Sequence, residues 1–287
     1  MPNDLPTNEN TYILDSESAA EMARLIYQDR LITNNMGGLL PEQDDISGLH
    51  DVLDIACGPG GWACDLAFKS PDIQVAGIDI SSKMVEYARA TASAQRLNNV
   101  QFRVMDALRP FDFPDNSFDL VNARFLVAFM PRTAWPKLLE ECVRITRPGG
   151  IIRLTEFDEP ATTNGAAFAH WMTLTFRAIQ LAGLCISPDG HNFGVTPLLR
   201  RFLLNAGCQN IEQKSHCIDF SFGTPAFDSM YRNCEVAFLQ VQPFIAKMKV
   251  ASPEEIEKSY QQMLMEMQSR DFCALWYYLT AWGQKPH

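Results

Sequence analysis

The chain has 287 residues, of which 47% are hydrophobic and 20% are charged. It is therefore long enough to bury a full hydrophobic core and too apolar to be disordered. Its 24 lysines and arginines are outnumbered by 34 aspartates and glutamates, which gives a net charge of -10. Such a chain lacks the positive field that attracts nucleic acid or an anionic membrane, so we expect neither as a partner.

Location and metal binding are read from apolar runs and from cysteine usage. No stretch reaches the ~18 apolar residues of a transmembrane helix. The first ten residues are polar, so we expect no secretory signal and a cytoplasmic location. The eight cysteines form no CxxC pair and the five histidines show no ligand spacing. These patterns predict buried thiols in a reducing compartment and no metal site.

The first predicted element is an amphipathic helix that begins after Ser18 and continues to about Thr33. Ser18 and Glu21 have the spacing of a capping box, and apolar residues then recur at helical intervals. Gly37 and Gly38 end the helix, because two consecutive glycines disfavour helical backbone.

Strands and helices then alternate along the chain. The predicted strands cover residues 51–56, 74–80, 100–105, 118–125 and 151–157. The predicted helices cover residues 60–70 and 81–96 and a segment that opens at Pro131. Such alternation predicts βαβ units, and hence a parallel sheet with helices on both faces.

The C-terminal part has a looser pattern. We predict helices over residues 166–184, 196–206, 225–248 and 252–269, and strands over residues 210–222 and 272–282. A helical stretch between two late strands predicts a cap inserted into the final hairpin of the sheet.

The loop after the first strand has the glycines of a ligand-binding turn. Gly58 and Gly60 remove side chains where a ligand must approach the backbone, at the carboxyl ends of the strands. Asp79 ends the next strand, where its carboxylate can bind a pair of ribose hydroxyls. The spacing of Gly58, Gly60 and Ala63 also fits the dinucleotide fingerprint of nicotinamide enzymes.

Acidic residues around this loop favour a different ligand. Asp54, just before the loop, would repel a pyrophosphate and attract an ammonium group. Asp106 ends the third strand, where a carboxylate can reach the edge of an adenine ring. The segments FDLV (118–121) and RPGG (147–150) flank the fourth and fifth strands in order.

With these motifs, the chain resembles the class I S-adenosylmethionine-dependent methyltransferases over about residues 51–157, and more weakly over the rest. The resemblance implies a Rossmann-like α/β fold with a mostly parallel seven-stranded sheet. It implies the strand order 3-2-1-4-5-7-6 with strand 7 antiparallel, and S-adenosyl-L-methionine as the cofactor. Ala56 departs from the usual glycine, although alanine is also common there.

The resemblance also assigns the cofactor contacts. The residues expected to bind the cofactor are Asp54, Ala56, Gly58, Gly60, Asp79, Ile80, Met84, Asp106, Ala107 and Asn122. Asp54 and the two glycines would line the methionine end, and Asp79 would hold the ribose. Ile80 and Met84 would lie against the adenine, with Asp106 and Ala107 at its amino edge. Asn122 would lie near the sulfonium.

The substrate is expected to be a small molecule. Nucleic-acid enzymes of the family that methylate amino groups carry Asn/Asp-Pro-Pro-aromatic after strand four, whereas residues 122–125 read NARF. The aromatic residues of the C-terminal part could line an apolar pocket, although most of them are expected to form the cap's own core. We therefore expect methylation, at carbon or oxygen, of a fairly apolar metabolite of the quinone or natural-product kind.

Two other functions stay open at this point, an NAD(P)-dependent oxidoreductase and a non-catalytic relative that binds the cofactor. A general base is needed only if the nucleophile holds a proton. The candidates for that base are Tyr27, Glu156, His170 and His191. An alkene nucleophile would need only a dry, aromatic-lined pocket.

The expected organisation has three parts. Residues 1–40 hold a lid helix, residues 41–160 and 193–287 form the methyltransferase core, and residues 161–192 and 223–269 form helical substrate-cap insertions. An exchange of lid or cap between the subunits of a homo-oligomer is left open.

Overall fold

Eight strands form a single sheet in this computed structural model, which describes residues 18–287. The strands are β1 (Asp51–Ile55), β2 (Gln74–Asp79), β3 (Val100–Val104), β4 (Phe118–Arg124), β5 (Thr146–Glu156), β6 (Thr162–Thr163), β7 (Gln209–Asp219) and β8 (Ala274–Gln284). Strands β1 to β5 are parallel, and β8 pairs antiparallel with β5, β6 and β7. With the two-residue β6 set aside, the expected order 3-2-1-4-5-7-6 with an antiparallel seventh strand is confirmed.

The central strands are apolar because both of their faces are covered. Four of the five residues of β1 and five of the seven residues of β4 are buried, as in parallel sheets with helices on both faces. Strand β7 lies at an edge, and most of its side chains are exposed.

Eight α-helices surround the sheet in the described part of the chain. They are α1 (Ala19–Met36), α2 (Gly61–Lys69), α3 (Ser82–Ala94), α4 (Trp135–Ile145), α5 (Ala166–Leu181), α6 (Leu199–Asn205), α7 (Phe227–Lys247) and α8 (Pro253–Met267). The expectation that α4 opens at Pro131 is wrong. Residues 131–134 form a turn in which the Ala134 amide donates to the Pro131 carbonyl at 2.9 Å, and the helix begins at Trp135.

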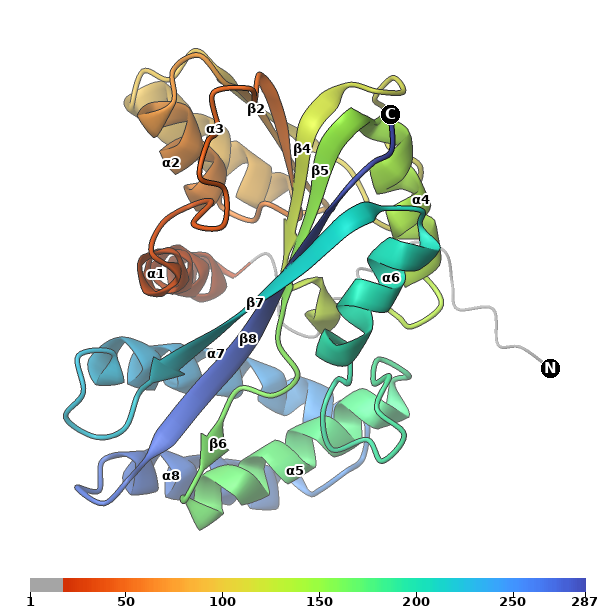
Figure 1. Ribbon diagram of the computed structural model, residues 1–287. Helices are drawn as coiled ribbons and strands as arrows, with labels where there is room; N and C mark the ends of the chain where they lie inside the picture. The colour runs from red at the N-terminus through yellow and green to blue at the C-terminus, as the bar shows by residue number, and fades with distance from the viewer. Residues whose placement is uncertain (1–17) are drawn as a thin grey trace.

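Helices α2 and α3 cover one face of the sheet, and α4 and α6 cover the other (Figure 1). Helices α5, α7 and α8 pack together as a further layer at one end of the sheet, and α1 packs against both α2 and α7. One continuous apolar cluster includes Leu53 of β1, Trp135 of α4, Trp171 of α5 and Phe238 of α7. Because α5 and α7 share this cluster with the sheet, these helices and the sheet stabilise one another.

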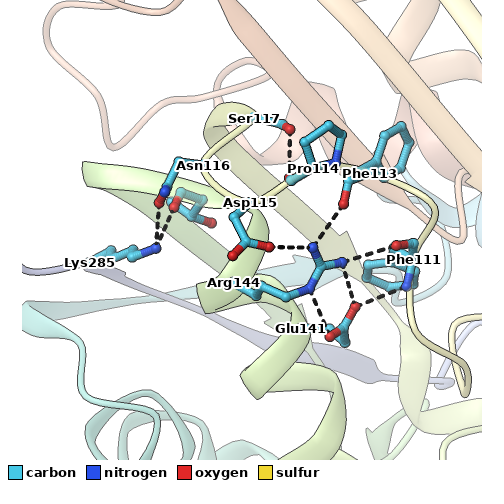
Figure 2. Close-up of polar contacts among 10 residues, drawn as sticks. Phe111, Phe113, Pro114, Asp115, Asn116, Ser117, Glu141, Arg144 and Lys285 are labelled. Atoms are coloured by element: carbon cyan, nitrogen blue, oxygen red, sulfur yellow. Dashed lines mark hydrogen bonds and ion pairs between the residues drawn. The ribbon is translucent and has the colours of Figure 1, made fainter.

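Arg144 of α4 makes several contacts with the long loop between β3 and β4 (Figure 2). Arg144 donates hydrogen bonds to the carbonyls of Phe111 at 3.0 Å and Phe113 at 2.8 Å. It also pairs with Asp115 and with Glu141, each at 2.8 Å. Glu141 in turn accepts the amide of Phe111 at 2.9 Å. The loop is therefore tied to α4 by groups of its own backbone.

No helix within residues 18–287 combines the length and the apolar character that crossing a bilayer requires. The polar first ten residues, on which the expectation of no secretory signal depends, lie outside the described residues. A cytoplasmic location stays a prediction. Five of the eight cysteines are buried as expected, whereas Cys185 is partly exposed and Cys217 and Cys273 are exposed.

Gly60 sits where a side chain does not fit. Its φ is +78°, and an added Cβ would lie 2.7 Å from the Cβ of Ala88 and 2.8 Å from the ring of Phe102. We predict that Gly60→Ala lowers the free energy of unfolding by roughly 2–5 kcal/mol, from left-handed backbone and overpacking together.

The matched control for this prediction is Gly207→Ala. Gly207 has a φ of +89° but has no atom within 4 Å of an added Cβ, so only the backbone cost of about 1–2 kcal/mol applies. Urea unfolding of both variants measures the difference. If the two variants are equally destabilised, the overlap of the added methyl group with Ala88 and Phe102 costs no stability, and the prediction is contradicted.

Candidate functional site

A cavity of about 280 Å³ lies at the carboxyl ends of β1, β2 and β4. Helix α1 forms one wall, and α5, α7 and the first half of β8 form the others. The volume is near the lower end of the range for small-molecule sites. Its position at the carboxyl ends of the strands is the one at which an open α/β sheet binds its ligands.

The cavity contains most of the residues expected to bind a cofactor. Those that line it are Asp54, Ala56, Gly58, Asp79, Ile80, Met84, Asp106 and Ala107. Gly60 faces Ala88 and Phe102 instead, and Asn122 has no exposed surface. The structure thus brings eight of the ten residues together at one wall, and their contacts with a cofactor stay predictions.

The glycine loop owes its shape to left-handed backbone. Ala56 and Gly58 both have a φ of +53°, a conformation that costs a non-glycine residue about 1–2 kcal/mol. Asp79 holds the loop, because one carboxylate oxygen accepts the Gly58 amide and the other accepts the Ser81 amide, both at 2.9 Å. Asp79 is therefore a support of the loop as well as a candidate ribose ligand.

Asp54 is held by a chain of buried polar groups. The Asn122 side chain donates to Asp54 at 2.7 Å and accepts from Arg153 at 2.7 Å, and Arg153 pairs with Glu42. Burial raises the pKa of Asp54 to about 6, although the charge of Arg124 and the bond from Asn122 oppose this shift. Asp54 is thus a carboxylate at the cavity wall whose charge depends on pH near neutrality.

Arg124 and Asp29 are cavity residues that the sequence did not single out as site residues. The Arg124 guanidinium lies 2.6 Å from the Asp29 carboxylate and 5.8 Å from the centre of the Trp62 ring. Arg124 follows Asn122 by two positions at the end of β4, a position that could have marked it. No local signal marked Asp29, because only the packing of α1 brings it to the site.

The part of the cavity between α5, α7 and β8 is apolar. Phe157, Phe176, Phe238 and Trp276 line it. Phe125 stacks on Trp276 with ring centres 5.7 Å apart. This apolar compartment adjoins the acidic wall and can exclude water from a ligand bound there.

Comparison with known proteins identifies the domain that builds the acidic wall. Residues 52–150 match a family described as a methyltransferase domain. Over these residues the chain is similar to methyltransferase domains. The resemblance inferred from the glycine loop and from its acidic neighbours is thereby confirmed.

The curated relatives are similar to this chain over little more than a hundred residues. Demethylmenaquinone methyltransferase of Deinococcus radiodurans is 37% identical over 111 residues, which cover 39% of this chain and 44% of that protein. Methyltransferase str3 of Strobilurus tenacellus is 31% identical over 116 residues, which cover 40% of this chain and 38% of that protein. The matched region is therefore less than half the length of these relatives.

Solved structures resemble this chain over most of its length. YcgJ of Bacillus subtilis has a TM-score of 0.55 at 18% identity, covering 88% of this chain and 99% of that one. Phosphoethanolamine N-methyltransferase 2 of Haemonchus contortus, in complex with S-adenosyl-L-methionine, has a TM-score of 0.57 at 19% identity, covering 93% and 57%. At this identity the likeness shows the fold.

The four candidate bases do not line the cavity. The side chain of Tyr27 is 67% exposed on the outer side of α1, and Glu156 is wholly buried. His170 and His191 are exposed, and His170 borders a separate depression between α5 and α8. Each base role stays a prediction that the geometry does not support. Within residues 18–287, no group of acidic, histidine and cysteine side chains could hold a metal ion.

Glu156 instead supports a turn of the cavity wall. Its carboxyl group accepts the amides of Leu126 at 2.8 Å and Val127 at 3.3 Å. These residues begin the short 3₁₀ turn Leu126–Ala128, which follows Phe125. Burial raises the pKa of Glu156 to about 8, so the carboxyl group is largely neutral at pH 7.

We predict that the stability of the protein falls as pH rises from about 4.5 to 8, and that Glu156→Gln removes much of this fall. In the unfolded chain the carboxyl group ionises near pH 4.3, whereas in the folded protein it keeps its proton until about pH 8. The free energy of unfolding that Glu156 contributes is therefore fully present below about pH 4.3. It is lost by about pH 8, a change of up to a few kcal/mol.

Urea unfolding at several pH values measures this effect. The control is Glu159→Gln, which changes an exposed glutamate three residues further along the chain. A pH dependence that is the same in the wild type and in Glu156→Gln would contradict the prediction.

Proposed function

We propose that the chain is an S-adenosylmethionine-dependent methyltransferase that methylates a small, largely apolar molecule at carbon or oxygen. The observation that carries the proposal is Asp54, a buried carboxylate that lines the cavity beside the glycine loop and is oriented by Asn122 and Arg153. A carboxylate in this place attracts the cofactor's ammonium group and would repel a pyrophosphate.

The charge of the cavity fits this cofactor. The charged residues among the described residues that line it are four aspartates and two arginines, namely Asp29, Asp54, Asp79, Asp106, Arg24 and Arg124. S-Adenosylmethionine carries a sulfonium, an ammonium and one carboxylate, so its net charge is positive and opposite to that of the wall. A nicotinamide dinucleotide is negative, and the match to a methyltransferase family also disfavours it.

In this proposal, each part of the wall has a role toward the cofactor. Asp54 holds the ammonium group and Asp79 the ribose hydroxyls, while Ile80 and Met84 lie against the adenine. When bound, the cofactor supplies an electrophilic methyl group on a good leaving group. The protein then has to orient the nucleophile and exclude water, and the apolar compartment does both. Helix α1 acts as the lid, and α5, α7 and α8 form the substrate cap.

The substrate class is supported by the lining of the cavity and by a relative. The compartment beside the acidic wall is aromatic, which suits an apolar ring system. The Deinococcus radiodurans relative is named for demethylmenaquinone. A quinone-like or natural-product substrate therefore fits this chain best.

The experiment that tests the cofactor is isothermal titration of the wild type and Asp54→Asn with S-adenosylmethionine, S-adenosylhomocysteine and NAD. We expect Asp54→Asn to weaken binding of the first two roughly tenfold to a hundredfold, because a hydrogen bond to a charged group is lost. Asp72→Asn removes an exposed carboxylate two residues before β2 and should bind like the wild type. Wild-type binding of NAD but not of S-adenosylhomocysteine would refute the proposal.

The pKa of Asp54 gives a second test of the same contact. Because Asp54 has a pKa of about 6 in the free protein, we expect affinity for S-adenosylhomocysteine to fall roughly tenfold between pH 7 and pH 5 as the carboxylate is protonated. In Asp54→Asn the affinity should stay nearly level over this range. An equal fall in both proteins would assign the titration to another group.

A further inference from the structure

Helices α1 and α7 pack against each other (Figure 1). Both line the cavity, and their contact contains the buried Arg24. The side chain of Arg24 is 6% exposed, and that of its partner Glu21 is not exposed at all. Two hydrogen bonds, of 2.6 and 2.7 Å, join the guanidinium to the Glu21 carboxylate. The charge of Arg24 is thus balanced within α1.

Two carboxamides share the remaining face of this guanidinium. Arg24 Nη1 donates to Asn233 Oδ1 at 2.8 Å and to Gln28 Oε1. A guanidinium has donors and no acceptor, so both amides must turn their oxygens toward Arg24 and their NH₂ groups away from it. Arg24, Gln28 and Asn233 form what we call the α1–α7 seam.

The amide nitrogens of the seam are available to a ligand. Gln28 and Asn233 both line the cavity. Within residues 18–287, neither Gln28 Nε2 nor Asn233 Nδ2 donates a hydrogen bond to the protein. The neighbouring compartment is apolar. The one hydroxyl that residues 18–287 contribute to the cavity lining, on Thr175, donates to the Trp171 carbonyl at 3.1 Å. The seam is thus a pair of donors at the border of an apolar space.

The charges around the seam select a neutral acceptor. Glu21 balances Arg24, and the carboxylates of Asp29 and Asp54 line the same cavity, so an anionic ligand meets no net positive charge. The seam also lies close to the glycine loop, because Leu25, three residues before Gln28, is 3.7 Å from where a Cβ of Gly58 would lie.

We infer that the substrate is an apolar molecule that carries a neutral carbonyl oxygen, and that the NH₂ groups of Gln28 and Asn233 bind this oxygen. That the bound molecule is the substrate rests on the proposed function. That the site binds a neutral acceptor follows from the orientation that Arg24 imposes on the two amides.

The test compares two probes of the same shape, 2-acetylnaphthalene and its hydrocarbon isostere 2-isopropenylnaphthalene, by equilibrium dialysis against the full chain. The variants Asn233→Asp and Gln28→Glu keep the oxygen that Arg24 binds and remove the donor. We expect each to weaken binding of the ketone about tenfold and to leave the hydrocarbon unchanged. Retained hydrocarbon binding also shows that the variant is folded.

Two further variants make the comparison decisive. Asn233→Leu removes the donor without adding a charge and should also weaken only the ketone. Phe176→Leu changes the apolar compartment and should weaken both probes alike. The inference is overturned if ketone binding is unchanged in the donor variants, if both probes weaken equally there, or if the wild type binds neither probe. It is also overturned if 2-naphthoate binds more tightly than the ketone.

The dialysis is run with and without S-adenosylhomocysteine, which keeps the two hypotheses apart. Failure of the chain to bind S-adenosylhomocysteine refutes the proposed function. The difference between ketone and hydrocarbon can still be measured on the chain alone, and its absence refutes only the assignment of the seam.

Discussion

The guanidinium of Arg153 lies in the middle of the sheet with no exposed surface, and the arrangement of the site depends on how that charge is balanced. Burying a cation is costly unless it is paired and fully hydrogen-bonded. Glu42 pairs with Arg153, and Asn122 accepts from it. Asn122 must therefore turn its NH₂ group the other way, toward Asp54. Asp54, Asn122 and Arg153 are direct neighbours in register across β1, β4 and β5, so strand pairing itself aligns them.

The same device occurs twice in this protein. At the sheet, Arg153 fixes the amide of Asn122 and thereby the carboxylate of Asp54. At the α1–α7 seam, Arg24 fixes the amides of Gln28 and Asn233. In both places a buried cation with an acidic partner binds the oxygen of an amide, so the NH₂ group points the other way, toward Asp54 at the sheet and away from Arg24 at the seam. An amide alone could present either end, so the charge converts an ambiguous group into a donor of known direction.

The parts that the sequence predicted are those coded by local pattern. Alternating strands and helices predicted a parallel sheet, and the resemblance to methyltransferases predicted its strand order. The glycine spacing with Asp54, Asp79 and Asp106 predicted one wall of the cavity. The base candidates failed to reach the cavity because residue type does not say which way a side chain faces, as with Tyr27 on the outer side of α1. The seam could not be predicted, since it joins residues about two hundred positions apart that only helix packing brings together.

The position of β8 has a consequence for synthesis of the chain. Strand β8 follows all other described strands in sequence, yet it pairs with β5 on one side and is the partner of both β6 and β7. Until residues 274–284 leave the ribosome, β7 has no strand to pair with, and the cap helices lack Trp276 and Tyr278 from their common core. The first five strands can assemble early, whereas the apolar residues of α5 and α7 stay exposed to solvent until β8 is made. This nascent state is the stage at which the protein is most open to aggregation and to chaperone binding.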